Sequence, residues 1–310
     1  MKGAANAALR KAILAAARNR ALGRFVQRHG MRLGAARFVA GTTLDECVAA
    51  IRRLNGDGLH ANTTLLGEGV TDSGGARAVA AEYATILRRL ADEDLRCNVA
   101  LKLTHLGLVI DEELAYENVK SVVEEAAQLG NFVRIDMEDS PWVDATLRTY
   151  RRLRAEGLDN VGAVLQAYLY RTPNDLEELL PLQPNLRLVK GAYLEPPEVA
   201  FARKADVDAS YVRLLERMLT GGGYTAVATH DEAMIRHTLD FTERNAIGRD
   251  RFELQMLYGV RTQRQRELVR DGYKVLVATP FGPDWYPYLM RRLAERPANL
   301  LFFLRSVVRR

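Results

Sequence analysis

Charged and polar side chains recur directly after short apolar segments of the chain. Lys102 and Lys190 lie inside such segments, where an unpaired ammonium is costly. Each therefore needs a carboxylate, a bound anion or a shifted pKa, and these groups suit a small anionic substrate. The residues at the segment ends are Lys102, Thr104, His105, Asp136, Glu138, Asp139, Gln166, Lys190, Tyr193, Thr229, His230, Asp231, Gln255 and Tyr258.

Some of these residue types also support other interpretations. Histidine and carboxylate side chains are metal ligands. The alternative function is therefore a metal-dependent (β/α)8 barrel hydrolase that uses His105, Asp136, Glu138 and His230. We interpret Glu138 and Asp139 as a solvated acidic loop, and His230 as either a functional or a buried core histidine.

Two consecutive arginines near the C-terminus form a second candidate site. Tyr288, Arg291, Arg292 and Glu295 are spaced by three and four residues, so they share one side of a predicted helix. Two guanidiniums in this arrangement are well shaped to bind a carboxylate. The chain has no G-x-G-x-x-G motif after a strand and no P-loop, so neither a Rossmann dinucleotide site nor a nucleotide triphosphatase is indicated.

These residues must be positioned by a repeating unit of strand and helix. The apolar segments are rich in β-branched residues and lack clean alternation, which is typical of a parallel sheet covered on both faces. Eight such units predict an α/β protein with a (β/α)8 TIM barrel, whose active site lies at the C-terminal ends of the strands. We place this barrel at residues 58–310 and a basic, helical N-terminal arm at residues 1–57. The segments begin at Gly58, Cys97, Asn131, Val161, Leu186, Tyr224, Arg251 and Lys274.

Side-chain caps indicate where helices begin. Thr43 and Glu46 have the spacing of a capping box. Asp111 is expected to begin a helix that Gly130 ends. Ser140 and Thr172 each precede a proline, and both are predicted to be N-caps.

Positive charge is concentrated at the N-terminus. Residues 1–37 hold nine Lys or Arg and no Asp or Glu, whereas the rest of the chain holds 35 basic and 39 acidic side chains. We interpret this arm as an Ala-rich helix packed on the body, with contact to an anionic membrane as the alternative. No nucleic acid partner is expected, because the arm has few aromatic residues for base stacking.

The cysteines and the hydropathy pattern indicate the cellular setting. Cys47 and Cys97 have no metal-binding spacing, and no apolar run approaches the length of a membrane span. We expect a cytoplasmic protein, with peripheral attachment to the inner membrane as an option.

Seven motifs occur in a characteristic order between Arg37 and Asn299. They are LKLTHLG, RIDMEDS, LQAYLYR, RLVKGAYLE, ATHD, FELQMLYG and YLMRRLAERPAN. In this order they resemble the flavin-dependent proline dehydrogenases, particularly the short single-function bacterial enzymes. The resemblance implies a distorted barrel that oxidises L-proline to Δ1-pyrroline-5-carboxylate, the first step of proline catabolism to glutamate. It also implies hydride transfer to FAD, a membrane quinone as electron acceptor and pyrroline-5-carboxylate dehydrogenase as a candidate partner.

The resemblance assigns roles to individual residues. Asp136 and Arg187 are the implied catalytic residues, with Arg187 near the reactive flavin nitrogen. Glu68 and Arg291 are the implied ion-pair gate over the substrate. The implied proline-binding residues are Lys102, Tyr193, Leu257, Tyr288, Arg291 and Arg292. The implied FAD-binding residues are Met137, Gln166, Arg187, Lys190, Gly191, Ala192, Thr229, His230 and Glu295.

Two positions depart from the family pattern. Ala278 stands where many members have a tyrosine near the catalytic aspartate, which leaves Asp136 without an expected hydrogen bond. Leu194 replaces an aromatic residue of the longer bifunctional relatives. Neither change affects the implied carboxylate clamp.

Overall fold

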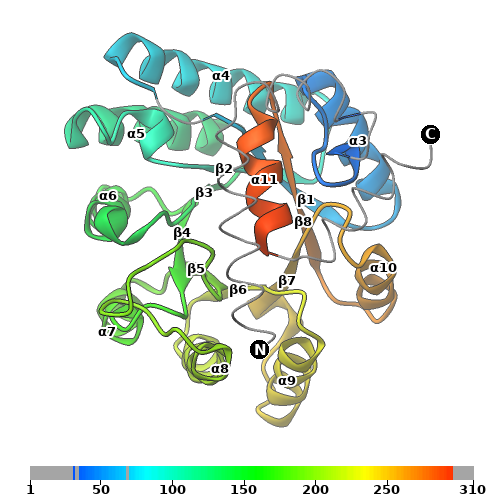
Figure 1. Ribbon diagram of the computed structural model, residues 1–310. Coiled ribbons are helices and arrows are strands. Elements are labelled where there is room, and N and C mark those ends of the chain that lie inside the picture. The colour runs from blue at the N-terminus through cyan, green and yellow to red at the C-terminus, as the bar shows by residue number, and fades with distance from the viewer. Residues whose placement is uncertain (1–30, 32–34, 68–69, 296–310) are drawn as a thin grey trace.

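A closed barrel of eight parallel strands forms the centre of the molecule (Figure 1). The computed structural model describes residues 31, 35–67 and 70–295. Each strand pairs with the next one along the chain, and β8 pairs with β1. The predicted barrel is confirmed, because each apolar segment contains one strand. The strands are β1 His60–Leu65, β2 Cys97–Leu101, β3 Val133–Ile135, β4 Val161–Gln166, β5 Asn185–Val189, β6 Tyr224–Ala228, β7 Phe252–Leu257 and β8 Val275–Phe281.

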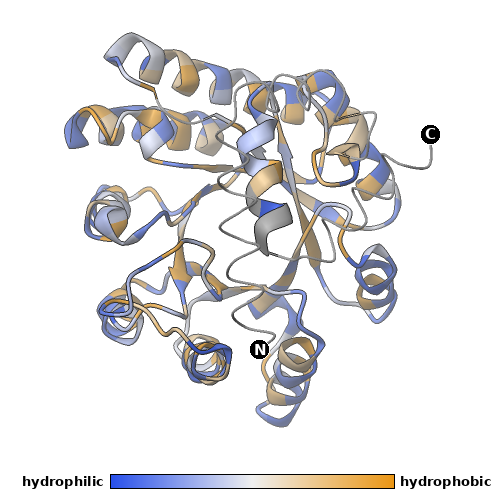
Figure 2. Cartoon of the chain, in the orientation of Figure 1, coloured by the Kyte–Doolittle hydropathy of each residue, from blue (hydrophilic) through white to orange (hydrophobic). Residues whose placement is uncertain are grey.

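Helices surround the strands and cover their outer face (Figure 1). Figure 2 shows these helices with hydrophobic residues on one side and hydrophilic residues on the other, as amphipathic packing on a barrel requires. The α-helices are α3 Leu44–Gly56, α4 Ser73–Asp92, α5 Glu112–Gln128, α6 Val143–Ala155, α7 Thr172–Leu179, α8 Lys204–Thr220, α9 Glu232–Arg244, α10 Thr262–Arg270 and α11 Trp285–Glu295. Short 3-10 helices are η1 Ala35–Arg37, η2 Thr104–Leu106, η3 Ser140–Trp142, η4 Leu180–Leu182 and η5 Arg249–Arg251.

Helix α11 lies over the ring of strands in Figure 1, at the end where β8 finishes. Its Trp285 and Leu289 join Leu66 and Phe38 in a small apolar cluster that is separate from the main core. The segment after η1 therefore packs at the C-terminal end of the barrel. Gly259, after β7, lies against the same segment, because a Cβ there would come within 1.7 Å of the carbonyl oxygen of Arg37.

Two of the predicted helix starts are confirmed. Asp111 caps α5, since its Oδ1 accepts a hydrogen bond of 2.8 Å from the N–H of Leu114. Thr43 caps α3 and accepts from the N–H of Glu46 at 3.3 Å. The carboxylate of Glu46 accepts from the N–H of Thr42 and also from the backbone of Thr43, and both bonds lower its pKa. The hydroxyl and the N–H of Thr42 together offer the carboxylate two donors.

The predicted N-caps before the two prolines are wrong. The Oγ of Ser140 donates to the carboxylate of Glu195 at 2.6 Å, and η3 follows Asp139 instead. The Oγ1 of Thr172 donates to the carbonyl of Gln166 at 2.6 Å, and α7 follows Arg171. Neither hydroxyl caps its helix, because each helix begins one residue earlier than predicted, after Asp139 and after Arg171.

The boundary proposed between arm and barrel stays a prediction. Most of the basic arm, residues 1–30 and 32–34, lies outside the described residues. Helix α3, at the end of the arm, packs against β1 and β8. In the described part of the chain, no helix combines the length and the apolar character that crossing a bilayer demands.

Candidate active site

An ion pair between β3 and β5 lies at the centre of the site. Arg187 Nη1 donates to Asp136 Oδ1 at 2.7 Å, and Nη2 donates to Asn62 Oδ1 at 2.7 Å. Lys102 Nζ lies 3.7 Å from Asp136 Oδ2. These residues come from β1, β5 and the ends of β2 and β3, so the barrel brings Lys102, Asp136 and Arg187 together at the predicted face.

Positive charge exceeds negative charge in this group. Within ion-pair distance, Arg187 and Lys102 share the carboxylate of Asp136. The buried Glu138 carboxyl also attracts Lys102, but burial raises its pKa and so opposes its negative charge. The buried Nε of Arg187 has no hydrogen-bond partner among the residues that the structure describes. A buried donor without a partner is costly, and together with the surplus cation it favours an anionic or electron-rich ligand at this position.

Glu138 does not belong to a solvated loop, and that interpretation is wrong. Its side chain is buried and accepts from the N–H of Thr104 at 3.1 Å and from the hydroxyl of Thr104 at 2.6 Å. Burial raises the pKa of the Glu138 carboxyl above its ordinary value. The main-chain carbonyl of Glu138 accepts from Gln166 Nε2 at 2.9 Å, which holds this amide beside the buried Met137. Asp139 is partly exposed.

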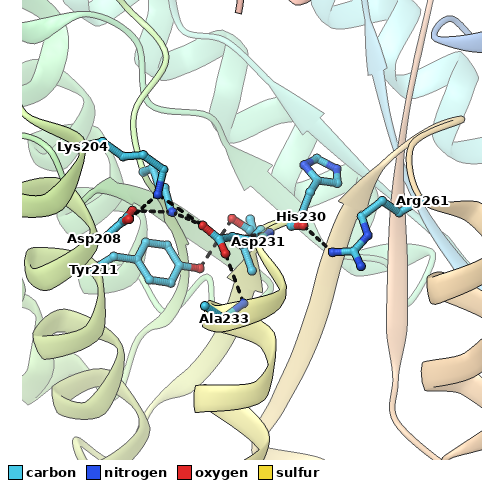
Figure 3. Close-up of polar contacts among 10 residues, drawn as sticks. Lys204, Asp208, Tyr211, His230, Asp231, Ala233 and Arg261 are labelled. Atoms are coloured by element: carbon cyan, nitrogen blue, oxygen red, sulfur yellow. Dashed lines mark hydrogen bonds and ion pairs between the residues drawn. The ribbon is translucent and has the colours of Figure 1, made fainter. Parts of the chain in front are cut away.

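Lys190 belongs to a second charged group at the same face, whose Lys204, Asp208 and Asp231 are shown in Figure 3. Its Nζ donates to Asp208 at 2.5 Å and to Asp231 at 2.8 Å. Lys204 forms ion pairs with the same two carboxylates. The bond from Lys190 lowers the pKa of Asp231, and bonds from both lysines outweigh burial to lower the pKa of Asp208. The two lysines and two aspartates balance, so this ammonium is already neutralised by protein carboxylates.

Gly191 continues the chain from Lys190 in a conformation that favours glycine. Its φ is +116°, and a Cβ at this position would come within 2.2 Å of the Tyr168 ring. Tyr168 is buried below the loop after β5. A side chain at residue 191 would therefore displace either this ring or the loop.

His230, a predicted FAD-binding residue, contacts the main chain of Leu257, a predicted proline-binding residue. Its Nε2 accepts from the N–H of Leu257 at 2.9 Å, so the neutral imidazole carries its proton on Nδ1. Its carbonyl accepts from Arg261 Nη1 at 2.7 Å (Figure 3). The Oγ1 of Thr229 accepts from the N–H of Asp231 at 3.1 Å. The ends of β6 and β7 are thus tied together by His230.

The substrate clamp is described only in part. In α11 the guanidinium carbon of Arg292 lies 5.4 Å from the centre of the Tyr288 ring. Tyr193 is partly buried in the loop after β5. Glu68 and the side chains of Arg291 and Glu295 lie outside the described residues. The gate and the full clamp therefore stay predictions.

The two positions that depart from the family pattern, Ala278 and Leu194, lie at different depths in the molecule. Ala278 pairs with Asn62 on one side and Leu257 on the other, within the barrel wall. Asn62 bonds the Arg187 guanidinium that holds Asp136. Leu194 is 62% exposed in the loop after β5, away from this wall.

Several functional contacts were not predicted from the sequence. Asn62 could have been noticed as an amide inside an apolar strand, and Arg134 as a cation two residues before Asp136. Asp208 carries no such signal, because an aspartate on a helix is usually solvated. Within the described ranges, no group of three or more His, Cys, Asp or Glu side chains could hold a metal ion. The hydrolase alternative therefore has no support.

A closed barrel with a cation-rich ion-pair group at the C-terminal ends of its strands is typical of a (β/α)8 enzyme. The family model "Proline dehydrogenase" matches residues 47–305, and the chain belongs to the proline dehydrogenase family. "Proline dehydrogenase 1" of Bacillus subtilis subsp. natto is 42% identical over 97% of this chain and 100% of its own length. "Proline dehydrogenase" of Deinococcus radiodurans is 41% identical over 89% of this chain and 90% of its own length.

A solved structure has the same fold. It is proline utilization A (PutA) from Bdellovibrio bacteriovorus, inactivated by N-propargylglycine, with a TM-score of 0.78 and 23% identity. The match covers 84% of this chain and 32% of that chain. This chain is similar to the short single-function bacterial relatives over most of their length.

Proposed function

We propose that this chain oxidises L-proline to Δ1-pyrroline-5-carboxylate with FAD as the electron acceptor, as the first step of proline catabolism to glutamate. Family membership supports the activity. The observation that carries the proposal is the group of Arg187, Asp136 and Lys102 at the barrel face, with its surplus cation. In this reaction proline loses a hydride from the ring carbon beside nitrogen and a proton from nitrogen, and the C–N bond becomes C=N.

The residues at this face fit a flavin. The partnerless Nε of Arg187 and the surplus positive charge suit a ring system that becomes more negative on reduction. When bound, FAD would supply the acceptor for the hydride, which carries both electrons of the oxidation. The Lys190 ammonium is neutralised, so we assign the main chain of residues 190–192 to the cofactor in place of that charge. The remaining FAD-binding residues proposed are Met137, Gln166, Arg187, Thr229, His230 and Glu295.

The residues of the chain bind and orient the substrate. Lys102, Arg291 and Arg292 bind the proline carboxylate, and each charge-assisted hydrogen bond contributes about 1.5–3 kcal/mol. Tyr193, Leu257 and Tyr288 enclose the apolar ring. Asp136 holds Arg187 and Lys102 in place. Orientation of the ring carbon toward the acceptor supplies most of the catalysis.

A gate would exclude water from this arrangement. We assign it to an ion pair between Glu68 and Arg291, which closes over bound proline. Exclusion of water strengthens the charge interactions around the substrate.

The C-terminal face of the barrel is also where we propose that a membrane quinone receives the electrons. The large apolar side chains that are exposed in the described part of the chain all lie on loops at this face, after β2, β4 and β5. They are Val109 (56%), Ile110 (41%), Tyr170 (46%) and Leu194 (62%). The basic arm joins the body at the same face, beside α11. Peripheral contact of a cytoplasmic enzyme with the inner membrane, and pyrroline-5-carboxylate dehydrogenase as the consumer of the product, belong to this proposal.

An absorbance spectrum tests the function. The purified protein should show a flavin spectrum, and anaerobic addition of L-proline should bleach it. The Lys102→Met variant is the control, because Lys102 is assigned to the proline carboxylate and not to FAD, so this variant should bind flavin and bleach more slowly. A protein that takes up no FAD, or whose flavin stays oxidised with proline, would contradict the proposal.

A further inference from the structure

A second arginine lies inside the barrel, one layer below the ion pair of the site. Arg134 precedes Asp136 by two residues on β3, and Asn185 precedes Arg187 by two residues on β5. Side chains two apart on a strand point to the same face, so Arg134 and Asn185 repeat toward the barrel interior the arrangement of Asp136 and Arg187. Arg134 is 2% exposed.

The contacts of Arg134 span three strands. Its Nη1 donates to the carbonyl oxygens of Ala163 at 3.0 Å and Asn185 at 2.8 Å, and its Nη2 donates to Asn185 Oδ1 at 2.5 Å. Gly162, on β4 between them, leaves room for the guanidinium. A Cβ at Gly162 would come within 2.3 Å of Arg134 Nη1. The guanidinium therefore fits only because residue 162 on β4 has no side chain.

The charge of Arg134 has no direct counter-ion in the described part of the chain. Its partners there are carbonyl and amide oxygens, and no carboxylate of a described residue lies within 4 Å. Burial, and then repulsion by Arg187, outweigh the more distant attraction of the buried Glu253 carboxylate and lower the pKa of Arg134 to about 9, which keeps it protonated at neutral pH. A neutral glutamine could donate to the same oxygens without the penalty of burying a cation. The chain bears the cost of burying this cation although a neutral donor could bond to the same oxygens, which indicates that the positive charge has a function.

We propose that Arg134 is a second positive charge directly beneath the site, which acts on the bound cofactor through its electric field. A buried charge is screened less by solvent than a surface charge, so its field reaches the adjacent layer. This inference rests on the proposed FAD site, where the field makes the transfer of two electrons to the flavin more favourable. Arg134 touches neither substrate nor cofactor in this assignment.

The two-electron midpoint potential of the bound flavin measures this field. Arg134→Gln keeps hydrogen-bonding capacity and removes the charge, and we expect about a tenfold loss in the preference for reduced flavin, which equals about 30 mV to the negative side. Arg134→Lys keeps the charge, so its preference for reduced flavin should stay within about threefold of that of the wild type. A tenfold change in this preference corresponds to about 1.4 kcal/mol. Tyr83→Phe removes another buried hydrogen bond, from its OH to the carbonyl of Ala100 at 2.9 Å, and should lower the unfolding temperature without moving the potential.

A second variant protects the test against misfolding. Asn185→Asp keeps the shape of the side chain and places a carboxylate beside the guanidinium, so it should shift the potential in the same negative direction as Arg134→Gln. An unchanged potential in both variants would overturn the inference, as would an equal shift in Arg134→Lys and Arg134→Gln. If the wild-type protein takes up no FAD, the proposed function fails first and this inference fails with it.

Discussion

Two groups of charges lie at the same end of the barrel and differ in their balance. Around Asp136, one carboxylate faces the cations of Arg187 and Lys102. Around Asp231, two carboxylates face Lys190 and Lys204. Among the ion pairs within 4 Å, a positive charge is left over in the first group and none in the second.

The difference in charge balance distinguishes a group that can bind a ligand from a group that stabilises the fold. A surplus cation next to a buried donor without a partner makes a ligand more stable there. A balanced group gains nothing from a further anion, and it ties the end of β5 to α8 and to the first turn of α9. Lys102 and Lys190 look alike in the sequence, as single lysines in apolar strands. Their functions differ because their partners differ.

Removal of the Arg187 guanidinium should have the largest effect on activity. Arg187→Met leaves the carboxylate of Asp136 and the amide oxygen of Asn62 without their donor. We expect kcat/KM for proline to fall about 100- to 1000-fold, the usual cost of losing one preorganised donor at a reacting centre. Steady-state kinetics with a soluble dye as acceptor measure the loss.

Arg187→Lys is the matched control, because it retains a charge and loses the forked geometry. It should recover part of the activity that Arg187→Met loses. Activity of Arg187→Met within threefold of the wild type would show that the first group supports the fold and does not act in the reaction.

Removal of the Lys190 ammonium should destabilise the fold more than it slows the reaction. Lys190→Met leaves Asp208 and Asp231 facing each other with only the exposed Lys204 between them. The side chains of Lys190, Asp208 and Asp231 are 23–29% exposed, so breaking this partly buried pair costs about 1–3 kcal/mol, between the values for exposed and buried pairs. Denaturant unfolding at neutral pH measures the loss. A fall in kcat/KM as large as that of Arg187→Met, without loss of stability, would contradict the division into two kinds of group.

The pH dependence of stability gives the same division a second test. In the folded chain the pKa of Asp231 lies below its ordinary value of 3.8, chiefly because of Lys190. The stability from this pair is therefore complete above about pH 3.8 and is lost as the pH falls through the lowered pKa. The difference in stability between wild type and Lys190→Met should shrink below pH 3.8. A constant difference across that range would show that the charge of Asp231 is not involved.

A methyl group at Gly191 should have an intermediate effect. In Gly191→Ala the Cβ meets the ring of Tyr168, and the backbone stays at a φ that alanine rarely adopts. We expect a loss of about 1–3 kcal/mol in stability and weaker retention of FAD on dilution. Gly130→Ala is the control, since it has a positive φ and nothing within 4 Å of the added Cβ. Equal losses in both variants would assign the effect to backbone strain alone.

The strand positions and the ion pair of Asp136 and Arg187 were predictable, because the segments are apolar and the polar residues follow their ends. Asp136 and Arg187 were identified from motifs, and the barrel confirms that they meet. The partners of Lys190 were not predictable, because Asp208 lies 18 residues away on the far side of a loop. Glu138 was misinterpreted for a related reason. The hydroxyl of Thr104 that donates to the Glu138 carboxylate lies after a different strand. The spacing of residues within one segment carries no information about such contacts.

The smallest effect should come from the second lysine of the balanced group. Lys204 bonds the same carboxylates as Lys190, but its side chain is 75% exposed, whereas that of Lys190 is 25% exposed. Solvent screens an exposed ion pair, which contributes about 0–1 kcal/mol. Lys204→Ala should therefore lower the stability by less than about 0.5 kcal/mol, measured by the same denaturant unfolding as Lys190→Met. A loss as large as that of Lys190→Met would mean that the number of cations controls this group, and that burial does not decide which lysine matters.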